Sequence, residues 1–257
     1  MTFTRAIVCM PGDNFADGLT HARLGRPDLE LARAQHARYC KALEQSGLAL
    51  THLPADAAHA DSTFIEDTAI VTRRCAVITR PGATSRQGEI AGTESALREF
   101  YKKFHRIDAP GTVDGGDVCQ AGSHFFIGIS ERTNVDGAHQ LATLLTHEGF
   151  TAAFVDIRNT RGILHLKSGI SYLGDRRLVV IDALAGNPAF SCYDVLRIAA
   201  AESYAANFLR LNEHILMSAG HPQFAETLDR YGCSVISLNM SEFKKMDGAL
   251  SCLSLRF

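Results

Sequence analysis

Residues 75–107, CAVITRPGATSRQGEIAGTESALREFYKKFHRI, and residues 124–157, HFFIGISERTNVDGAHQLATLLTHEGFTAAFVDI, follow the same order of local patterns. Each begins with an apolar run typical of a strand, continues through a polar loop into a stretch of helical periodicity, and ends in a second apolar run. Looser copies occupy residues 177–198, 214–238 and 5–54, the last with a helix expected around residues 29–46. The pattern therefore predicts five related units in an α/β chain.

A short additional strand precedes four of these units, in residues 66–74, 115–123, 166–176 and 205–213. The first unit lacks this leading strand, and SCLSLRF at residues 251–257 can supply it. Pairing of the two chain ends would close five strand, strand, helix, strand units into a ring without a free sheet edge. We therefore predict one domain over residues 1–257, a five-module α/β-propeller built from ββαβ units around a central pore.

Composition narrows the function to small-molecule chemistry. With 46% hydrophobic and 21% charged residues, the 257-residue chain can bury a large core. A net charge of −2 without a basic stripe predicts no nucleic-acid partner, and no apolar run approaches membrane-spanning length. Seven cysteines without a C-x-x-C pair argue against a disulfide framework and a zinc ribbon, and favour the reducing cytoplasm. The oligomeric state stays open, a homodimer included.

Ring closure would gather the residues at the start of each leading strand around the pore. These residues are Glu66, Asp67, Asp114, Asp117, His165, Asn207 and Cys252, with Arg86 and Arg132 near the same mouth. Taken singly, the acids could form turns, the histidine could be a core residue and the arginines could be solvated. Together, a thiol, an imidazole and several carboxylates at equivalent points favour a catalytic site, because burial penalises them unless they are partners.

The acids indicate what the thiol would attack. A thiol with a pKa of about 8.5 needs a positive neighbour to become a nucleophile, either His165 as imidazolium or a cationic substrate. Carboxylates would raise the thiol pKa unless a guanidinium lies between them, which predicts a guanidine substrate. His165 would protonate the departing amine and later deprotonate water. Arg86 and Arg132 could bind an α-carboxylate, and Asp61 an α-ammonium.

The chain resembles the dimethylarginine dimethylaminohydrolase family of guanidino-group-modifying enzymes, which have the five-module pentein fold. The resemblance covers nearly the whole chain and rests on DGLT, FIEDTAIV, ITRPGATSRQGE, GTVDGGDV, SERTN, ILHLKSG, SYAANF and KKMDGALSCLS. It implies that Cys252 attacks the guanidinium carbon to form a covalent thiouronium, with His165 as general acid and base and Asp114 orienting the guanidinium and His165. The products would be citrulline and dimethylamine or methylamine, formed without a cofactor.

The resemblance also implies a substrate-binding set, namely Leu19, Asp61, Glu66, Asp67, Arg86, Arg132 and the backbone of Met246. Residues 12–28 resemble the mobile lid of the family. Some bacterial members of the family carry Glu where this chain has Asp114. Both side chains are long enough for the carboxylate to reach a guanidinium. The related arginine deiminases contain an inserted helical region that this chain lacks, which favours a methylated substrate.

Other functions fit the sequence less well. Short relatives that hydrolyse Nω-hydroxyarginine would carry a similar catalytic set. A non-catalytic pentein of the ribosome anti-association type would not need a thiol, an imidazole and acids at one mouth. A metal hydrolase using His165, Asp67, Asp114 and Asp117 lacks paired histidine ligands. Cys119 could be an alternative nucleophile, but strand alternation turns it into the core. The sequence contains no glycine-rich phosphate-binding loop, so no nucleotide cofactor is expected.

Overall fold

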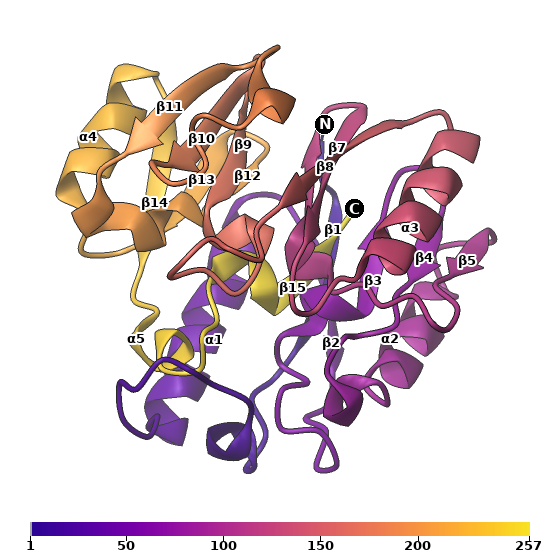
Figure 1. The fold of residues 1–257 in the computed structure, drawn as a ribbon. Helices are drawn as coiled ribbons and strands as arrows, with labels where there is room; N and C mark the ends of the chain where they lie inside the picture. The colour runs from indigo at the N-terminus through magenta and orange to yellow at the C-terminus, as the bar shows by residue number, and fades with distance from the viewer. Residues whose placement is uncertain (1) are drawn as a thin grey trace.

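The computed structural model describes residues 2–257 and contains five three-stranded sheets arranged around a common centre (Figure 1). In every sheet the middle strand pairs antiparallel with the leading strand and parallel with the last one. In chain order the sheets comprise β15 (Ser254–Arg256), β1 (Arg5–Cys9) and β2 (Ala49–Leu53); β3 (Ala69–Val71), β4 (Ala76–Ile78) and β5 (Phe104–Arg106); β6 (Val118–Ala121), β7 (His124–Ile129) and β8 (Thr151–Asp156); β9 (Ile170–Gly174), β10 (Arg177–Ile181) and β11 (Asp194–Ile198); and β12 (Leu209–Leu211), β13 (His214–Ser218) and β14 (Ser234–Leu238). The predicted five-module architecture is confirmed.

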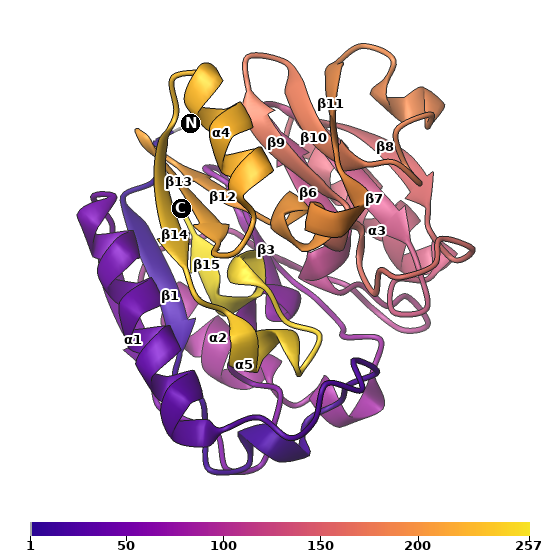
Figure 2. The same cartoon turned by 90° about the vertical axis from the view of Figure 1, so that its left-hand side faces the viewer.

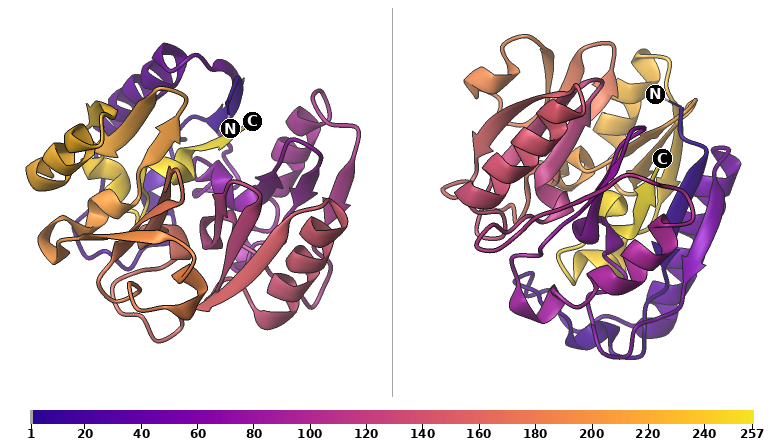
Figure 3. Two further views of the ribbon diagram at one scale, coloured as in Figure 1. Left: turned by 90° about the horizontal axis from the view of Figure 1, so that it is seen from above. Right: turned by 90° about the vertical axis from the view of Figure 1, so that its right-hand side faces the viewer.

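The two ends of the chain complete one sheet. Strand β1 pairs with β15 in a register that places Ala6 opposite Arg256, and the N–H of Thr4 donates to the carbonyl of Phe257 at 2.9 Å. Both ends therefore lie close together, as Figure 2 shows. Leading strands contact one another toward the centre, β15 with β3, β6 with β9 and β9 with β12, and the view from above in Figure 3 shows the sheets around that centre.

Four longer helices cover the outside of the sheets, namely α1 (Leu29–Gln45), α2 (Ile90–Leu97), α3 (Val135–His147) and α4 (Pro222–Arg230), while the short α5 (Ser241–Lys244) precedes the last strand. Side chains at the N-caps fix two of the starts: Asp28 accepts the N–H of Leu31 at 2.9 Å, and Asn134 accepts the N–H of Gly137 at 2.8 Å. Within residues 2–257 no helix has the length and apolar character needed to cross a bilayer.

The fourth unit departs from the predicted repeat. Between β10 and β11 the chain forms turns and the single 3-10 turn η6 (Pro188–Phe190), so the expected α-helix is absent from this described segment. Gly186 and Pro188 interrupt the segment, and the connection is too short for a helix of several turns. The prediction of a helix in every unit was therefore wrong for this one.

A 3-10 turn precedes every leading strand. The five turns are η2 (Ile65–Thr68), η4 (Gly115–Asp117), η5 (Leu166–Ser168), η7 (Ala200–Ala206) and η8 (Leu250–Leu253). Besides η6, the two other 3-10 turns in residues 2–257 are η1 (Phe15–Asp17) and η3 (Thr84–Arg86), which lie in the loops of the first two units. The sequence predicted that the pore residues begin the strands themselves. They lie instead within these turns or at their ends, because i to i+3 bonds such as Asp117 N–H to Asp114 C=O, at 3.0 Å, tighten the chain before it extends.

Candidate active site

One cavity at the end of the central pore gathers most of the predicted residues. Its empty volume, open mouth included, is about 370 Å³. From the predicted set the lining contains Leu19, Asp61, Asp67, Arg86, Arg132, His165, Met246 and Cys252. The sequence analysis did not single out the other lining residues, which are Phe64, Leu164, Asp247 and Gly248. Phe64 and Leu164 lie beside residues already singled out in the chain, and that proximity is the signal that could have found them.

Asp114 lies directly behind His165. Its Oδ2 is 3.1 Å from Nε2 of His165, and its Oδ1 accepts the N–H of Gly82 at 2.8 Å. Burial alone would lower the pKa of His165, but the carboxylates of Asp67, Asp117 and Asp114 outweigh burial and raise this pKa to about 9. The imidazole is therefore protonated at neutral pH and can donate a proton.

Asp67 supplies a permanent negative charge in the cavity. Oδ1 accepts the N–H of Gly116 at 2.7 Å, and Oδ2 accepts from Nη1 of Arg86 at 2.6 Å. Burial would raise the pKa of Asp67, but the positive charges of His165 and Arg86 prevail and lower it to about 2. A cationic group entering the cavity thus meets an ionised carboxylate.

Cys252 lies in the turn η8, in contact with the network that fixes its neighbour Ser251. The Oγ of Ser251 donates to Oε2 of Glu66 at 2.7 Å, and its N–H donates to Oδ1 of Asn207 at 2.9 Å. Burial, followed by the carboxylates of Glu66 and Asp67, raises the pKa of Cys252 to about 12. Without a ligand the group is consequently a thiol, as the sequence analysis expected for a thiol surrounded by acids.

Glu66 is placed differently from the other acids. It lines a second, larger cavity between the five leading strands, together with Lys167 and Arg256. Its Oε1 is 2.6 Å from Nζ of Lys167 and 2.8 Å from Nη2 of Arg256. The structure therefore gives Glu66 cationic partners of its own, and its negative charge acts on Cys252 from behind.

The two predicted arginines have unequal surroundings. Arg86 is buried, and its guanidinium donates to Asp67 and, through Nε and Nη2, to both carboxylate oxygens of Glu89. No hydrogen bond or ion pair of the Arg132 guanidinium is found within the part of the chain that the structure describes. Sequence reasoning missed Glu89, although its spacing of three residues from Arg86 could have indicated the pair.

The segment 12–28 lies against the cavity through Leu19. The N–H of Leu19 donates to Oδ1 and Oδ2 of Asp61 at 3.1 and 3.2 Å, and Oγ1 of Thr20 donates to the carbonyl of Lys245 at 2.9 Å. Asp61, predicted to hold an α-ammonium, is thus in contact with the segment that resembles a lid. The mobility of this segment remains a prediction.

Asp67, Asp114 and His165 also place three potential metal-ligand atoms within 4.8 Å of one another. The donors fit a metal poorly, because the carboxylate oxygens already accept from Gly116, Arg86 and Gly82, and Arg86 is a fixed cation beside them. Asp117 faces elsewhere, accepting from the hydroxyls of Ser130 and Thr133 at 2.6 and 2.7 Å. Cys119 is only 4% exposed and packs in the core, as strand alternation predicted.

The chain is similar to several known proteins. The family model for arginine deiminase matches residues 59–200. The chain is 42% identical to the dimethylarginine dimethylaminohydrolase of Pseudomonas aeruginosa, over 99% of this chain and 100% of that protein, and 34% identical to the Streptomyces coelicolor enzyme of the same name, over 100% and 98%.

Solved structures give the same picture. A variant of the Pseudomonas aeruginosa enzyme with serine in place of a cysteine, complexed with citrulline, matches with a TM-score of 0.96 at 41% identity over 100% of both chains. The N-terminal domain of ArgZ, a cyanobacterial arginine dihydrolase, matches with a TM-score of 0.89 at 19% identity, over 100% of this chain and 97% of that one. At 19% identity, the similarity to the ArgZ domain concerns the fold alone.

Proposed function

Because the chain belongs to the dimethylarginine dimethylaminohydrolase family, we propose that it hydrolyses Nω-methylated arginines to citrulline and dimethylamine or methylamine. It is a hydrolase that acts on C–N bonds, and its small-molecule substrate enters the cavity that Cys252 and His165 line. The observation that carries the proposal is this shared cavity, in which a thiol, a protonated imidazole and the ionised Asp67 face the same space.

The first half of the reaction needs a thiolate. A bound guanidinium brings positive charge between Cys252 and Asp67, which offsets the carboxylates that hold the thiol pKa high and favours loss of the thiol proton to solvent. The sulfur then bonds to the guanidinium carbon. His165 gives its proton to the methylated nitrogen, the C–N bond breaks, and the amine leaves a thiouronium on Cys252.

The second half regenerates the enzyme. His165, neutral after the first transfer, takes a proton from water, and the resulting hydroxide adds to the thiouronium carbon. The C–S bond then breaks as the carbonyl forms, and the hydroxyl proton passes to the departing sulfur, which releases citrulline and restores the thiol. Asp114 holds the imidazole through its 3.1 Å contact with Nε2, and it thereby keeps His165 oriented for both proton transfers.

Binding of the amino-acid end is proposed to use the outer part of the cavity. Arg132, whose guanidinium forms no hydrogen bond or ion pair with other described residues, would pair with the α-carboxylate. Arg86 is already paired with Asp67 and Glu89, and it would attract the α-carboxylate through its positive charge. Asp61 would take the α-ammonium, with Leu19 and the Met246 backbone around it. Asp67 would bind the guanidinium directly, and Glu66 would act from behind Cys252.

Product analysis tests the substrate. Separate incubations with asymmetric dimethylarginine, monomethylarginine, Nω-hydroxyarginine and arginine would be analysed for citrulline, ornithine and released amine by mass spectrometry. We expect citrulline from the methylated compounds. Turnover of Nω-hydroxyarginine alone, or of arginine alone, would instead select one of the neighbouring activities, and no turnover of any compound would favour a binding protein.

Two cysteine variants test the nucleophile. We expect Cys252→Ser to lower kcat by a factor on the order of 10⁴ while the protein stays folded. Cys119→Ser is the matched control, since that thiol lies in the core, and its turnover per folded molecule should be unchanged. Equal turnover in Cys252→Ser and the wild type would move the nucleophile elsewhere.

We further propose that the enzyme works in the cytoplasm, and a homodimer remains a prediction. All seven cysteines are unpaired in the structure, and four of them are buried, which supports a reducing compartment.

A further inference from the structure

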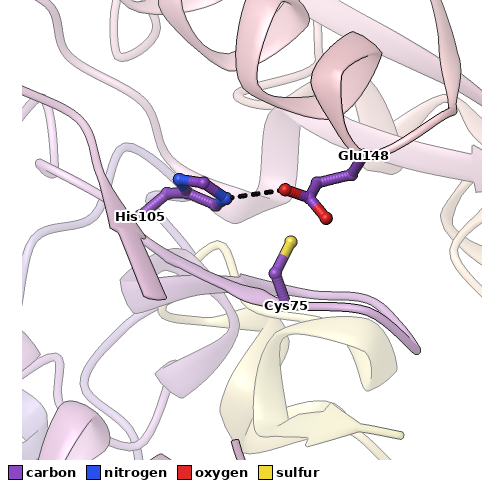
Figure 4. Close-up of side chains that lie close together, drawn as sticks. All are labelled: Cys75, His105 and Glu148. Carbon is purple, nitrogen blue, oxygen red and sulfur yellow. Dashed lines mark hydrogen bonds and ion pairs between the residues drawn. The ribbon is translucent and has the colours of Figure 1, made fainter. Parts of the chain in front are cut away.

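A second group of reactive side chains lies outside the cavity. Cys75, His105 and Glu148 point toward one another in Figure 4, and their potential ligand atoms all lie within 4.8 Å of each other. None of the three lines the active-site cavity. The group joins a thiol, an imidazole and a carboxylate, which are the three side-chain types that bind zinc most often.

Three elements bring these residues together. Cys75 ends the turn between β3 and β4 and is fully buried, while His105 lies on β5 opposite Val77 of β4. Glu148 caps the C-terminus of α3, where its N–H donates to the carbonyls of Leu144 and Leu145. The cluster therefore connects the sheet of the second unit with the helix of the third.

The cluster is also separate from the catalytic residues along the same hairpin. Strand β3 runs from η2, which carries Glu66 and Asp67, to the turn at 72–75. Cys75 is consequently at the opposite end of β3 from those acids. A ligand at this point would act on the scaffold rather than on the substrate.

The present contacts leave room for a cation in place of a lysine. The Oε1 of Glu148 is 3.0 Å from Nε2 of His105 and 2.6 Å from Nζ of Lys103. Lys103 has a side chain that is 57% exposed, so it can move into solvent at little cost.

We propose that Cys75, His105 and Glu148 bind a zinc ion, with water as the fourth ligand. Binding forms bonds from zinc to Sγ of Cys75, to the imidazole and to the carboxylate; the thiol proton passes to solvent, and Lys103 leaves Glu148. Tetrahedral zinc sets its ligand atoms roughly 3.5 Å apart, so the group contracts by about 1.3 Å at most from its present limit of 4.8 Å, which side-chain rotation at the end of α3 can supply. The ion would join two neighbouring units of the ring.

Cobalt provides a direct probe of this site, because a thiolate bound to Co²⁺ gives a charge-transfer absorption in the near ultraviolet that carboxylate and imidazole ligands do not. All proteins would carry Cys252→Ser, which removes the active-site thiol as a second metal ligand. Co²⁺ titration should give this band at one ion per chain, and Zn²⁺ should displace it. Absence of the band would overturn the proposal.

Substitutions of the three proposed ligands and of Lys103 test which residues produce this Co²⁺ absorption band. Cys75→Ser should abolish it, and Glu148→Gln and His105→Asn should each weaken binding by about tenfold or more. Lys103→Met should tighten binding by about two- to fivefold, which is the range that an exposed ion pair supplies, because the competing cation is gone. That gain distinguishes the site from adventitious binding to a thiol.

Cys233→Ser is the matched control, since Cys233 is a partly exposed thiol outside the cluster. It should leave the band and the affinity unchanged. Loss of the band in Cys233→Ser, its persistence in Cys75→Ser, or an unchanged affinity in Lys103→Met would each contradict the proposed site. Lys103 is exposed and Cys233 is partly exposed, so the results for Lys103→Met and Cys233→Ser do not depend on whether the Cys75 variant folds.

Discussion

The charge state of Cys252 depends on what the cavity contains. Burial, Glu66 and Asp67 all favour the thiol, whereas a guanidinium substrate would favour the thiolate. The sequence could predict this conflict, because a thiol surrounded by acids needs a cation. It could not predict that Glu66 pairs with Lys167 and Arg256, since those residues come from different units and meet only after the ring closes.

Removing the charge of Glu66 should therefore activate the free thiol. In Glu66→Gln the cations Lys167 and Arg256 lose their carboxylate, so we expect the pKa of Cys252 to fall by about one unit or more and its alkylation by iodoacetamide at pH 8 to become about tenfold faster. The rate would be followed by peptide mass spectrometry. Glu226→Gln, at an exposed position on α4, is the control. An unchanged rate in Glu66→Gln would show that Glu66 does not set this pKa.

The pH dependence of the reaction should follow His165. Its pKa of about 9 keeps the imidazole protonated below that pH, so kcat at saturating asymmetric dimethylarginine, where the bound guanidinium favours the thiolate, should fall as the pH rises through about 9. In Asp114→Asn one of the carboxylates that raise this pKa is lost. The falling limb of the residual activity should then move to lower pH by about one unit. A limb that stays in place in Asp114→Asn would contradict the role given to the Asp114 and His165 pair.

At the scale of elements, short 3-10 turns carry the side chains that we propose to be catalytic. Short apolar runs next to polar loops and turns predicted the strands, because each run persists over several residues. The turns leave no periodic signal, since most of them span about one turn, and the sequence therefore placed Asp114 and Cys252 at the start of the leading strands. The sequence also predicted a helix in the fourth unit, which the described residues of that unit do not form. Leu184 and Phe190 supply the apolar residues that a helix would bury, but they pack in the core from turns.

Two of these turns approach each other too closely for a side chain at Gly115. A Cβ at Gly115 would lie 2.0 Å from the carbonyl oxygen of Glu66, and backbone cannot move aside as a side chain can. We expect Gly115→Ala to lower the free energy of unfolding by about 1–3 kcal/mol and to reduce kcat by displacing η2 from η4. Gly186→Ala is the control, since a Cβ there meets no atom within 4 Å. Chemical denaturation would measure both, and equal stability of the two variants would contradict the packing described.

At the scale of the whole molecule, the last strand closes the ring. The sequence allowed this prediction because the first unit lacked a leading strand and SCLSLRF had no unit of its own. The sequence did not reveal how the residues are distributed between the two cavities, with Glu66 lining one and Arg132 lining the other. That distribution depends on how each turn is oriented in three dimensions.

Removal of residues 254–257 should open the ring. The truncation deletes β15, exposes the edge of β1 and removes Arg256 from its buried pair with Glu66. Glu66 keeps Lys167 as a cationic partner, so the loss of Arg256 costs less than the roughly 3–5 kcal/mol of an uncompensated buried charge. The lost pairing of β15 with β1 adds to this cost, and we expect a large fall in Tm together with loss of activity. Calorimetry and citrulline release would measure the two effects. A truncated protein with the Tm and turnover of the full chain would show that closure is unnecessary.

The central claim is that the sulfur of Cys252 bonds to the guanidinium carbon during turnover. Acid quenching of the protein during turnover of asymmetric dimethylarginine, followed by intact and peptide mass spectrometry, tests it directly. We predict an added mass equal to the substrate less dimethylamine on the peptide that contains Cys252, and none in Cys252→Ser. Citrulline formation without this adduct, or with the adduct on another residue, would contradict the account.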